Sequence, residues 1–227
     1  MSLSLALVRP AAADSSALDV AAEANHRIAH NLSMIVAMAR LRASVVSKNP
    51  RMMRGSEVRS ILEEFAGRLD TLARLNHLLA RRQQETPIEI GDYLRDIAEA
   101  VISSLSVVGE TELQFTSDPG CVLAPEEALS LGLIVCELVT NAVKYAHPTG
   151  VAGQIIVSCR RTSRGNIAIE ISDDGVGLPE GVDPMKNGDF GFRLVRLLAH
   201  QLGTTIAFHS DCLGLRFVLS MPAALTA

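Results

Sequence analysis

Two long segments with helical apolar periodicity occupy the first third of the chain and restrict its possible folds most strongly. From Ile28 to Ala39, apolar residues recur at steps of three and four, within a segment that runs from about 16 to 46. A second such segment runs from about 56 to 82. Apolar residues at this spacing gather on one face of an α-helix. The sequence therefore predicts two long amphipathic helices, the first of which stops at Lys48-Asn49-Pro50.

Their short connection predicts that the two helices form an antiparallel hairpin. One hairpin cannot cover both of its apolar stripes, so a second copy of the chain is the economical partner. We therefore predict a homodimeric four-helix bundle, formed by residues 16–86 after an N-terminal tail at 1–15. The polar residues before Pro87 disfavour further helix and mark a domain boundary at 86/87.

The remaining residues, 87–227, carry a mixed pattern. Helices are predicted at about 90–105, 125–145 and 190–202, and strands at 113–116, 121–123, 154–160, 166–172, 204–209 and 215–221. Pro125 suits the first turn of its helix. Helices set against a mostly antiparallel sheet predict an α+β sandwich for this second domain.

The composition excludes several classes of protein. The chain has 227 residues, of which 48% are hydrophobic, and a net charge of −4, so it can bury sizeable cores but has no bulk attraction to nucleic acid. Its 4 cysteines show no CxxC spacing and are predicted to be reduced, buried thiols. Because no apolar run reaches about 18 residues, we expect a soluble, cytoplasmic protein without membrane insertion.

A row of polar residues interrupts the apolar helix predicted at 125–145. Glu137, Asn141 and Lys144 are spaced four and three apart, so they project from one face. The Asn141 amide oxygen suits Mg²⁺, Lys144 offers a phosphate a point charge, and Glu137 can accept a proton or position a water. A solvated polar stripe is the alternative, and it is the commoner explanation for such a helix taken alone.

The strand predicted at 166–172 leads into a turn with the sequence Asp173-Asp174-Gly175-Val176-Gly177. The Asp173 carboxylate can accept a hydrogen bond from the exocyclic amino group of adenine. Gly175 and Gly177 would let the backbone approach a ligand closely. Asp and Gly are also ordinary turn residues, so this motif is weak when it stands alone.

A third glycine-rich element, Gly188-Asp189-Phe190-Gly191, precedes the helix predicted at 190–202. Free N–H groups and the positive end of the helix dipole favour a phosphate there. A simple helix cap is the alternative for this element.

The residues and their order resemble the catalytic and ATP-binding domain of sensor histidine kinases, whose Bergerat fold is shared with the Hsp90, gyrase and MutL ATPases. The similar segments are LGLIVCELVTNAVKYAHP at 131–148 (N box), ISDDGVGLPEG at 171–181 (G1 box) and GFRLVRLLAHQLG at 191–203 (G2 box). The resemblance implies ATP and Mg²⁺ as cofactors, with Asn141 binding Mg²⁺ and Asp173 binding adenine. It also implies that residues 179–190 form the ATP lid.

His26 and His30 lie four residues apart on the first predicted helix. Helical histidines are usually surface residues, and such a pair can bind zinc, although no third ligand is evident nearby. The segment from Glu23 to Leu32 resembles the H box of the HisKA_2 and HWE branches, in which Arg and an apolar residue follow the phosphoacceptor. The resemblance implies that His26 is the nucleophile. Imidazole suits this role, because its neutral form keeps a lone pair for the γ-phosphorus. With no tryptophan in the chain, HisKA_2 is the better assignment.

Several positions depart from the family pattern. Ala29 and His30 stand where Lys and Asn are common, which leaves His30 as an alternative phosphoacceptor; Cys136 replaces Asn or His, and Leu215 replaces Thr. Asp189 replaces a glycine, and its charge would oppose a triphosphate by about 1 to 4 kcal/mol at ~4 Å. These changes predict weak or regulated use of ATP.

The resemblance implies an ATP-dependent protein-histidine kinase of two-component signalling. It would autophosphorylate on His26 and pass the phosphoryl group to an aspartate of a response regulator receiver domain, with input from an upstream sensor protein. The alternative is a histidine phosphotransfer protein with a vestigial ATP domain, against which the retention of Glu137, Asn141, Lys144 and Asp173 argues. A serine kinase or ATPase of the same fold is the third possibility, but those proteins lack a hairpin with such a histidine.

Overall fold

The computed structural model describes residues 13–47, 53–82, 87–105, 111–148, 151–163 and 165–222. The tail up to residue 12, the predicted helix stop at Lys48-Asn49-Pro50 and residues 83–86 of the predicted boundary lie outside the described residues. The chain separates into two compact units, Met1–Arg40 and Leu41–Ala227.

Two long helices come first in the described part of the chain. Helix α1 spans Ala13–Ser47 and α2 spans Gly55–Arg82, which confirms both predicted helices to within three residues at each end. Within the first unit, α1 exposes Ile28, Leu32 and Val36 by 56%, 57% and 47%. These residues are four apart, so they form one continuous apolar stripe on the helix.

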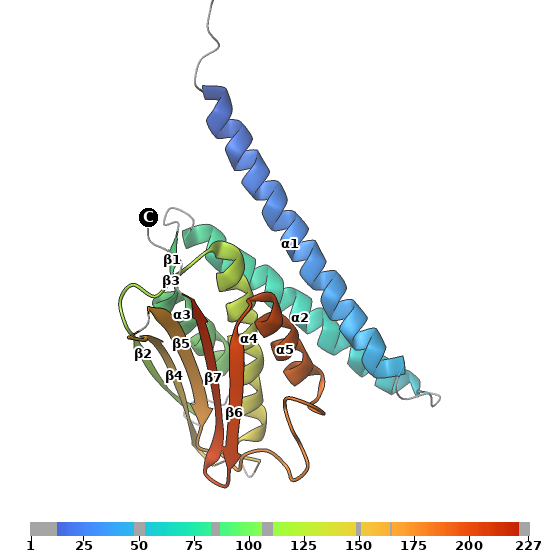
Figure 1. Ribbon diagram of the computed structural model, residues 1–227. Coiled ribbons are helices and arrows are strands. Elements are labelled where there is room, and N and C mark those ends of the chain that lie inside the picture. Colours follow the sequence, from blue (N-terminus) through green and yellow to red (C-terminus); the bar gives the residue numbers. More distant parts are fainter. Residues whose placement is uncertain are drawn as a thin grey trace, which may run out of the picture. The chain divides into compact units, whose positions relative to one another are not determined.

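A five-stranded sheet forms one layer of the second unit (Figure 1). Its strands, in spatial order, are β2 (Thr111–Ser117), β4 (Gly153–Arg161), β5 (Asn166–Asp173), β7 (Gly214–Pro222) and β6 (Thr205–Asp211). Only the β2–β4 pair is parallel, so the prediction of a mostly antiparallel sheet is confirmed. A separate two-stranded sheet pairs β1 (Ile88–Glu89) with β3 (Val122–Leu123). Strand β1 was not predicted, because its two residues run directly into α3, whose helical pattern begins at Ile90.

Where β5 and β7 pair, every second residue is apolar and buried, and these side chains form one side of the core. Ile167, Ile169 and Ile171 of β5 are buried and are register partners of Met221, Leu219 and Phe217 of β7, all of them buried as well. Directly opposed residues of an antiparallel pair project to the same face of the sheet. Each such apolar side chain contributes about 1.5 to 3 kcal/mol when it is fully buried.

Helices α3 (Ile90–Leu105), α4 (Pro125–Tyr145) and α5 (Phe190–Gln201) pack against one face of this sheet (Figure 1). Helix α4 is buried without interruption from Ala128 to Val139, and α2 also packs against it. Among the described residues, α4 is the one helix whose length and apolar composition would suit a membrane span, but 72% of its apolar window is buried in the protein. Its apolar character is therefore explained by its place in the core, and the α+β sandwich is confirmed.

The prediction for the cysteines is wrong at one position. Cys121, Cys136 and Cys159 are free and buried, whereas Cys212 is free and exposed. Cys212 lies in the tight turn between β6 and β7, where a side chain has no second layer to cover it.

Candidate functional site

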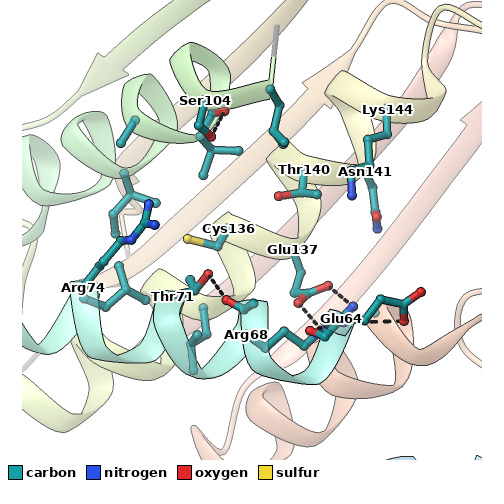
Figure 2. A pocket seen from close by; sticks show the side chains of 18 of the residues that line it. Glu64, Arg68, Thr71, Arg74, Ser104, Cys136, Glu137, Thr140, Asn141 and Lys144 are labelled. Atoms are coloured by element: carbon teal, nitrogen blue, oxygen red, sulfur yellow. Dashed lines mark hydrogen bonds and ion pairs between the residues drawn. The ribbon is translucent and has the colours of Figure 1, made fainter. Parts of the chain in front are cut away.

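The polar row on α4 faces a cavity of about 540 Å³. Figure 2 shows Glu137, Asn141 and Lys144 in succession along α4, with Arg68 of α2 beside Glu137. Glu137 is buried, Asn141 is half-buried and Lys144 is exposed. The spacing of four and three therefore places the three side chains on one face, but at increasing exposure toward the end of the helix.

Asn141 carries a buried polar atom without a partner. Its amide nitrogen, Nδ2, is shielded from solvent and makes no hydrogen bond among the described residues. A buried, unsatisfied amide costs about 1 to 3 kcal/mol, so such a group points to a ligand that completes it. The oxygen and nitrogen of an amide exchange places by a rotation of the side chain, and the oxygen is a ligand that suits Mg²⁺. The residue therefore fits the magnesium role.

Glu137 is held by a guanidinium group from α2. Arg68 Nε donates to Oε1 of Glu137 at 2.7 Å, and Arg68 Nη2 donates to Oε2 at 3.1 Å. Such a two-pronged pair is among the stronger hydrogen-bonded arrangements in proteins. Sequence reasoning missed Arg68, because an arginine on an amphipathic helix is most simply explained as a solvated residue.

Phe190, the first residue of α5, contacts the same guanidinium. The Cζ atom of Arg68 lies over the Phe190 ring, 4.5 Å from its centroid, and Cζ of Arg42 lies over the ring at 5.1 Å. Arg42 also forms an ion pair with Glu64 of α2 at 2.7 Å. The start of α5, the end of α1 and the middle of α2 are thus joined around one aromatic ring.

Asp189 acts as the N-cap of α5. Its Oδ1 accepts a hydrogen bond from the Phe192 N–H at 3.1 Å. The helix-cap alternative therefore applies to this residue, and its carboxylate occupies one of the N–H groups that an anion could use. Nucleotide titration of the wild type and of Asp189→Gly tests the prediction of weak or regulated ATP use.

Gly191 brings the start of α5 close to the polar row. A Cβ atom at this position would lie 3.0 Å from Glu137 Oε2 and 3.7 Å from Asn141 Nδ2. Gly188, in contrast, makes room for the side chain of Phe192. Of the two glycines predicted for phosphate, Gly191 therefore borders the Glu137 and Asn141 side chains, and Gly188 serves packing within the turn.

The Asp173 turn is built differently. Oδ1 of Asp173 accepts hydrogen bonds from the N–H groups of Gly175 at 3.0 Å and Leu215 at 3.3 Å. Burial raises the pKa of Asp173, and these two hydrogen bonds only partly oppose the shift. The turn contributes no residue to the cavity that the polar row lines.

Gly175 and Gly177 are required by contacts within the protein. A Cβ atom on Gly175 would overlap Ala146, just after α4, and one on Gly177 would overlap the Asp211 carbonyl oxygen at the β6–β7 turn. Gly177 also has φ +69°, a conformation that L side chains rarely adopt. Both positions therefore keep the turn closely packed against the end of α4 and the β6–β7 turn.

The segment predicted as the lid, 179–190, is fixed by hydrogen bonds to its own backbone and to α5. The Asn187 amide accepts from the Asp183 N–H and donates to the Gly181 carbonyl at 2.9 Å. From α5, Arg193 donates to the Gly188 carbonyl at 3.2 Å, and Arg196 donates to the Pro184 carbonyl. Two arginines one turn apart thus hold both halves of this segment.

The remaining predicted residues differ in exposure. His26 is exposed on α1 in the first compact unit, and His30 is half-buried. Cys136 is buried, and loss of hydration, followed by the neighbouring Glu137, raises the pKa of its thiol to about 12. A thiol of this kind stays protonated near neutral pH, so Cys136 acts as an apolar residue of the cavity wall.

Two family models match the chain. The HisKA_2 model, described as histidine kinase, matches residues 23–105. The HATPase_c model, described as histidine kinase-, DNA gyrase B-, and HSP90-like ATPase, matches residues 126–225. The first match includes His26, and the second includes the Asn141 and Asp173 motifs.

Individual relatives agree with these matches. The chain is 29% identical over 189 residues to blue-light-activated histidine kinase 2 of Erythrobacter litoralis. The aligned region covers 82% of this chain and 51% of that protein. It is 28% identical over 177 residues to the sensor histidine kinase PdtaS of Mycobacterium tuberculosis, covering 78% of this chain and 33% of that protein. The chain thus spans about half or less of these curated relatives.

A solved structure shares the fold. The blue-light activated histidine kinase EL346 of Erythrobacter litoralis superimposes with a TM-score of 0.69 at 25% identity, covering 96% of this chain and 62% of that one. The agreement extends across both the helical segment and the sheet domain.

Proposed function

Because the chain belongs to the HisKA_2-type histidine kinases with a GHKL-type ATPase domain, we propose that it is an ATP-dependent protein-histidine kinase. It autophosphorylates on His26 and passes the phosphoryl group to an aspartate of a response regulator receiver domain. The observation that carries this proposal is the amide nitrogen of Asn141, which is buried and has no hydrogen-bond partner among the described residues. It acts in the cytoplasm and takes its input from an upstream sensor.

In this proposal each end of the nucleotide has its own residues. The ionised carboxylate of Asp173 accepts from the adenine amino group, Lys144 offers a charge to the phosphates, and Asn141 is the protein ligand of the metal. A Mg²⁺ ion held by Asn141 would neutralise charge that develops on the phosphates during transfer. Gly191 keeps the space beside Glu137 and Asn141 open for the phosphates, and Gly175 and Gly177 shape the turn that presents Asp173.

The transfer itself uses a neutral imidazole. A ring nitrogen of His26 forms the N–P bond as the bond between the γ-phosphorus and the bridging oxygen breaks, and ADP leaves with that electron pair. The phosphorylated ring then gives its remaining N–H proton to Glu137, directly or through a water. His26 is exposed on α1.

We further propose that the working form is a homodimer. The exposed stripe of Ile28, Leu32 and Val36 on α1 is apolar, and α2 exposes Val58 and Leu62 by 42% and 61%. Apolar stripes on two helices of a hairpin are best covered by the same stripes of a second copy. Size measurement by light scattering tests this, with Leu32→Glu expected to shift the chain to monomers.

The function is tested with γ-labelled ATP and Mg²⁺. We expect acid-labile, alkali-stable label on the wild type and on His30→Ala, and no label on His26→Ala or Asn141→Ala. Label that survives in His26→Ala but not in His30→Ala would move the phosphoacceptor to His30. A wild type that takes no label from ATP, but does from a phosphorylated receiver domain, would replace the kinase with the phosphotransfer alternative, which no relative described above supports.

A further inference from the structure

The Arg68–Glu137 pair joins α2 to the residue proposed to receive the proton. Arg68 lies in the middle of α2, and Glu137 lies in the middle of α4. Their side chains are 20% and 11% exposed, so the pair is largely removed from water. Interactions between charges are screened less there than at an exposed surface, so this contact is more than a surface ion pair.

The geometry leaves Glu137 poorly placed to act as a base. Both of its carboxylate oxygens already accept hydrogen bonds from one guanidinium, at 2.7 and 3.1 Å. Each oxygen keeps a second lone pair, but the fork holds the carboxylate in one orientation toward α2, and a base must turn a lone pair toward the proton that it takes. Arginine stays protonated at any working pH, so it cannot pass a proton through the pair.

Neighbouring contacts fix Arg68 in this position. Its guanidinium lies over the Phe190 ring, and Nη1 donates to the Glu64 carbonyl one turn earlier at 3.3 Å. The Glu64 carboxylate in turn pairs with Arg42, whose guanidinium also lies over Phe190. Cation–π contacts of this kind contribute roughly 0.5 to 2 kcal/mol each. The cluster therefore links α2 both to the base on α4 and to the first residue of α5.

We propose that Arg68, Glu137 and Phe190 form an inhibitory latch between α2 and the nucleotide-binding domain. In the latched state Glu137 is occupied by Arg68, and autophosphorylation is slow. Displacement of α2 along or away from α4 separates the pair and releases the carboxylate. An input that moves α2 therefore controls the base directly. This proposal rests on the kinase function proposed above. Arg68 is a positioning residue, since it acts on the reaction through Glu137.

The latch is tested in the full chain by Arg68→Gln, which keeps a polar side chain but removes the charge. At saturating ATP we expect the initial rate of autophosphorylation to rise roughly fivefold or more, which is the lower end of typical coupling between a switch and a site. Arg68→Lys keeps the charge but loses the two-pronged fork, so its rate should lie between those of the wild type and Arg68→Gln. Arg59→Gln is the matched control, because Arg59 is exposed on the same helix, and its rate should equal that of the wild type.

A second measurement does not depend on kinase activity. Hydrogen exchange of the α2 amides, without nucleotide, should speed up by a similar factor in Arg68→Gln and in Glu137→Gln. The double variant should exchange no faster than either single variant, because each substitution breaks the same contact.

The outcomes separate the latch from the kinase. A faster rate in Arg68→Gln together with non-additive exchange supports the latch, as does label that appears only in that variant. If the wild type is labelled and Arg68→Gln is labelled at the same or a slower rate, the latch is overturned and the kinase proposal stands. Additive exchange also overturns the latch, whatever the rate. If neither protein is labelled, the kinase proposal fails and the latch fails with it.

Discussion

The two ends of the proposed nucleotide site are held together in different ways. The Asp173 turn is packed within the sheet domain, where it contacts the end of α4 and the β6–β7 turn through backbone and glycine positions. The Glu137 end is completed by side chains from α2, above all by Arg68. Contacts between backbones at close range leave little freedom, whereas an ion pair between two helices separates when one helix moves. Adenine binding is therefore expected to be a fixed property of the sheet domain, while the catalytic end is expected to respond to α2.

The largest effect is expected at the adenine turn, for Gly177→Ala. The new Cβ atom would overlap the Asp211 carbonyl oxygen and would sit on a backbone with φ +69°. Left-handed strain of about 1 to 2 kcal/mol and overpacking of about 1 to 3 kcal/mol together predict a loss of roughly 2 to 5 kcal/mol in unfolding free energy. Chemical denaturation of the two proteins gives this difference.

Gly181→Ala is the matched control for that substitution. Gly181 has φ +79°, but nothing lies within 4 Å of its hypothetical Cβ atom. It should therefore show only the conformational part of the loss, about 1 to 2 kcal/mol. Equal losses for the two variants would mean that the turn is not closely packed against the β6–β7 turn.

The next effect is expected at the other end of the site, for Asn141→Ala. Because Nδ2 of Asn141 has no partner, its removal should leave the unfolding free energy within about 1 kcal/mol of the wild type. Loss of the metal ligand should weaken Mg²⁺-dependent nucleotide binding by roughly tenfold to a hundredfold, which corresponds to about 1.5 to 3 kcal/mol. Calorimetric titration with a non-hydrolysable ATP analogue measures both the affinity and its dependence on Mg²⁺.

Thr140→Ala is the control for Asn141, since Thr140 is the adjacent residue and lines the same cavity. Its nucleotide affinity should match that of the wild type. If Asn141→Ala instead lowers stability while it leaves binding unchanged, the amide is a structural group and the phosphate end of the site lies elsewhere.

The same contrast explains what the sequence could predict. In the part of the chain that the structure describes, local patterns were sufficient for every helix, for six of the seven strands and for the common face of Glu137, Asn141 and Lys144, because periodicity along one element encodes them. Contacts between distant elements were not predictable in this way. Arg68 and Glu137 are 69 positions apart, and nothing in either helix alone identifies the other as its partner. The packing roles of Gly175 and Gly177 were not predictable either, since only the fold reveals that Ala146 and Asp211 lie against them.

A smaller effect is expected from pH at Asp173. Burial raises the pKa of this carboxyl above the ordinary value of about 3.9, so its protonated form is favoured in the folded protein more than in the unfolded one. The ionised form is the one that accepts from adenine. Nucleotide affinity should therefore be constant near neutral pH and fall as the pH decreases through this raised pKa. The free energy of unfolding should change in the opposite direction: it should rise as the pH falls, since protonation of Asp173 relieves the cost of a buried charge.

Nucleotide titrations between about pH 4.5 and 8 test this expectation, with Asp173→Asn as the control that cannot ionise. The variant should bind weakly at every pH and lose this pH dependence. An identical decline in wild type and variant would assign the dependence to another group.

The smallest effect is expected for the His147–Asp174 pair, which lies beside the adenine turn. His147 Nε2 and Asp174 Oδ1 are 2.7 Å apart, and the same oxygen accepts from the Gln154 N–H at 2.8 Å. Desolvation acts to raise the pKa of Asp174, but these hydrogen bonds and His147 outweigh it, so the pKa is lowered. The stabilisation is therefore present above the unfolded-state pKa of about 3.9 and is lost as the pH falls through the lower folded-state value. Asp174 is 53% exposed, so His147→Ala should cost at most about 1 kcal/mol at neutral pH. Thermal unfolding at neutral and acidic pH measures this, and a much larger loss would show that the end of α4 depends on the pair as well as on the close packing of Gly175.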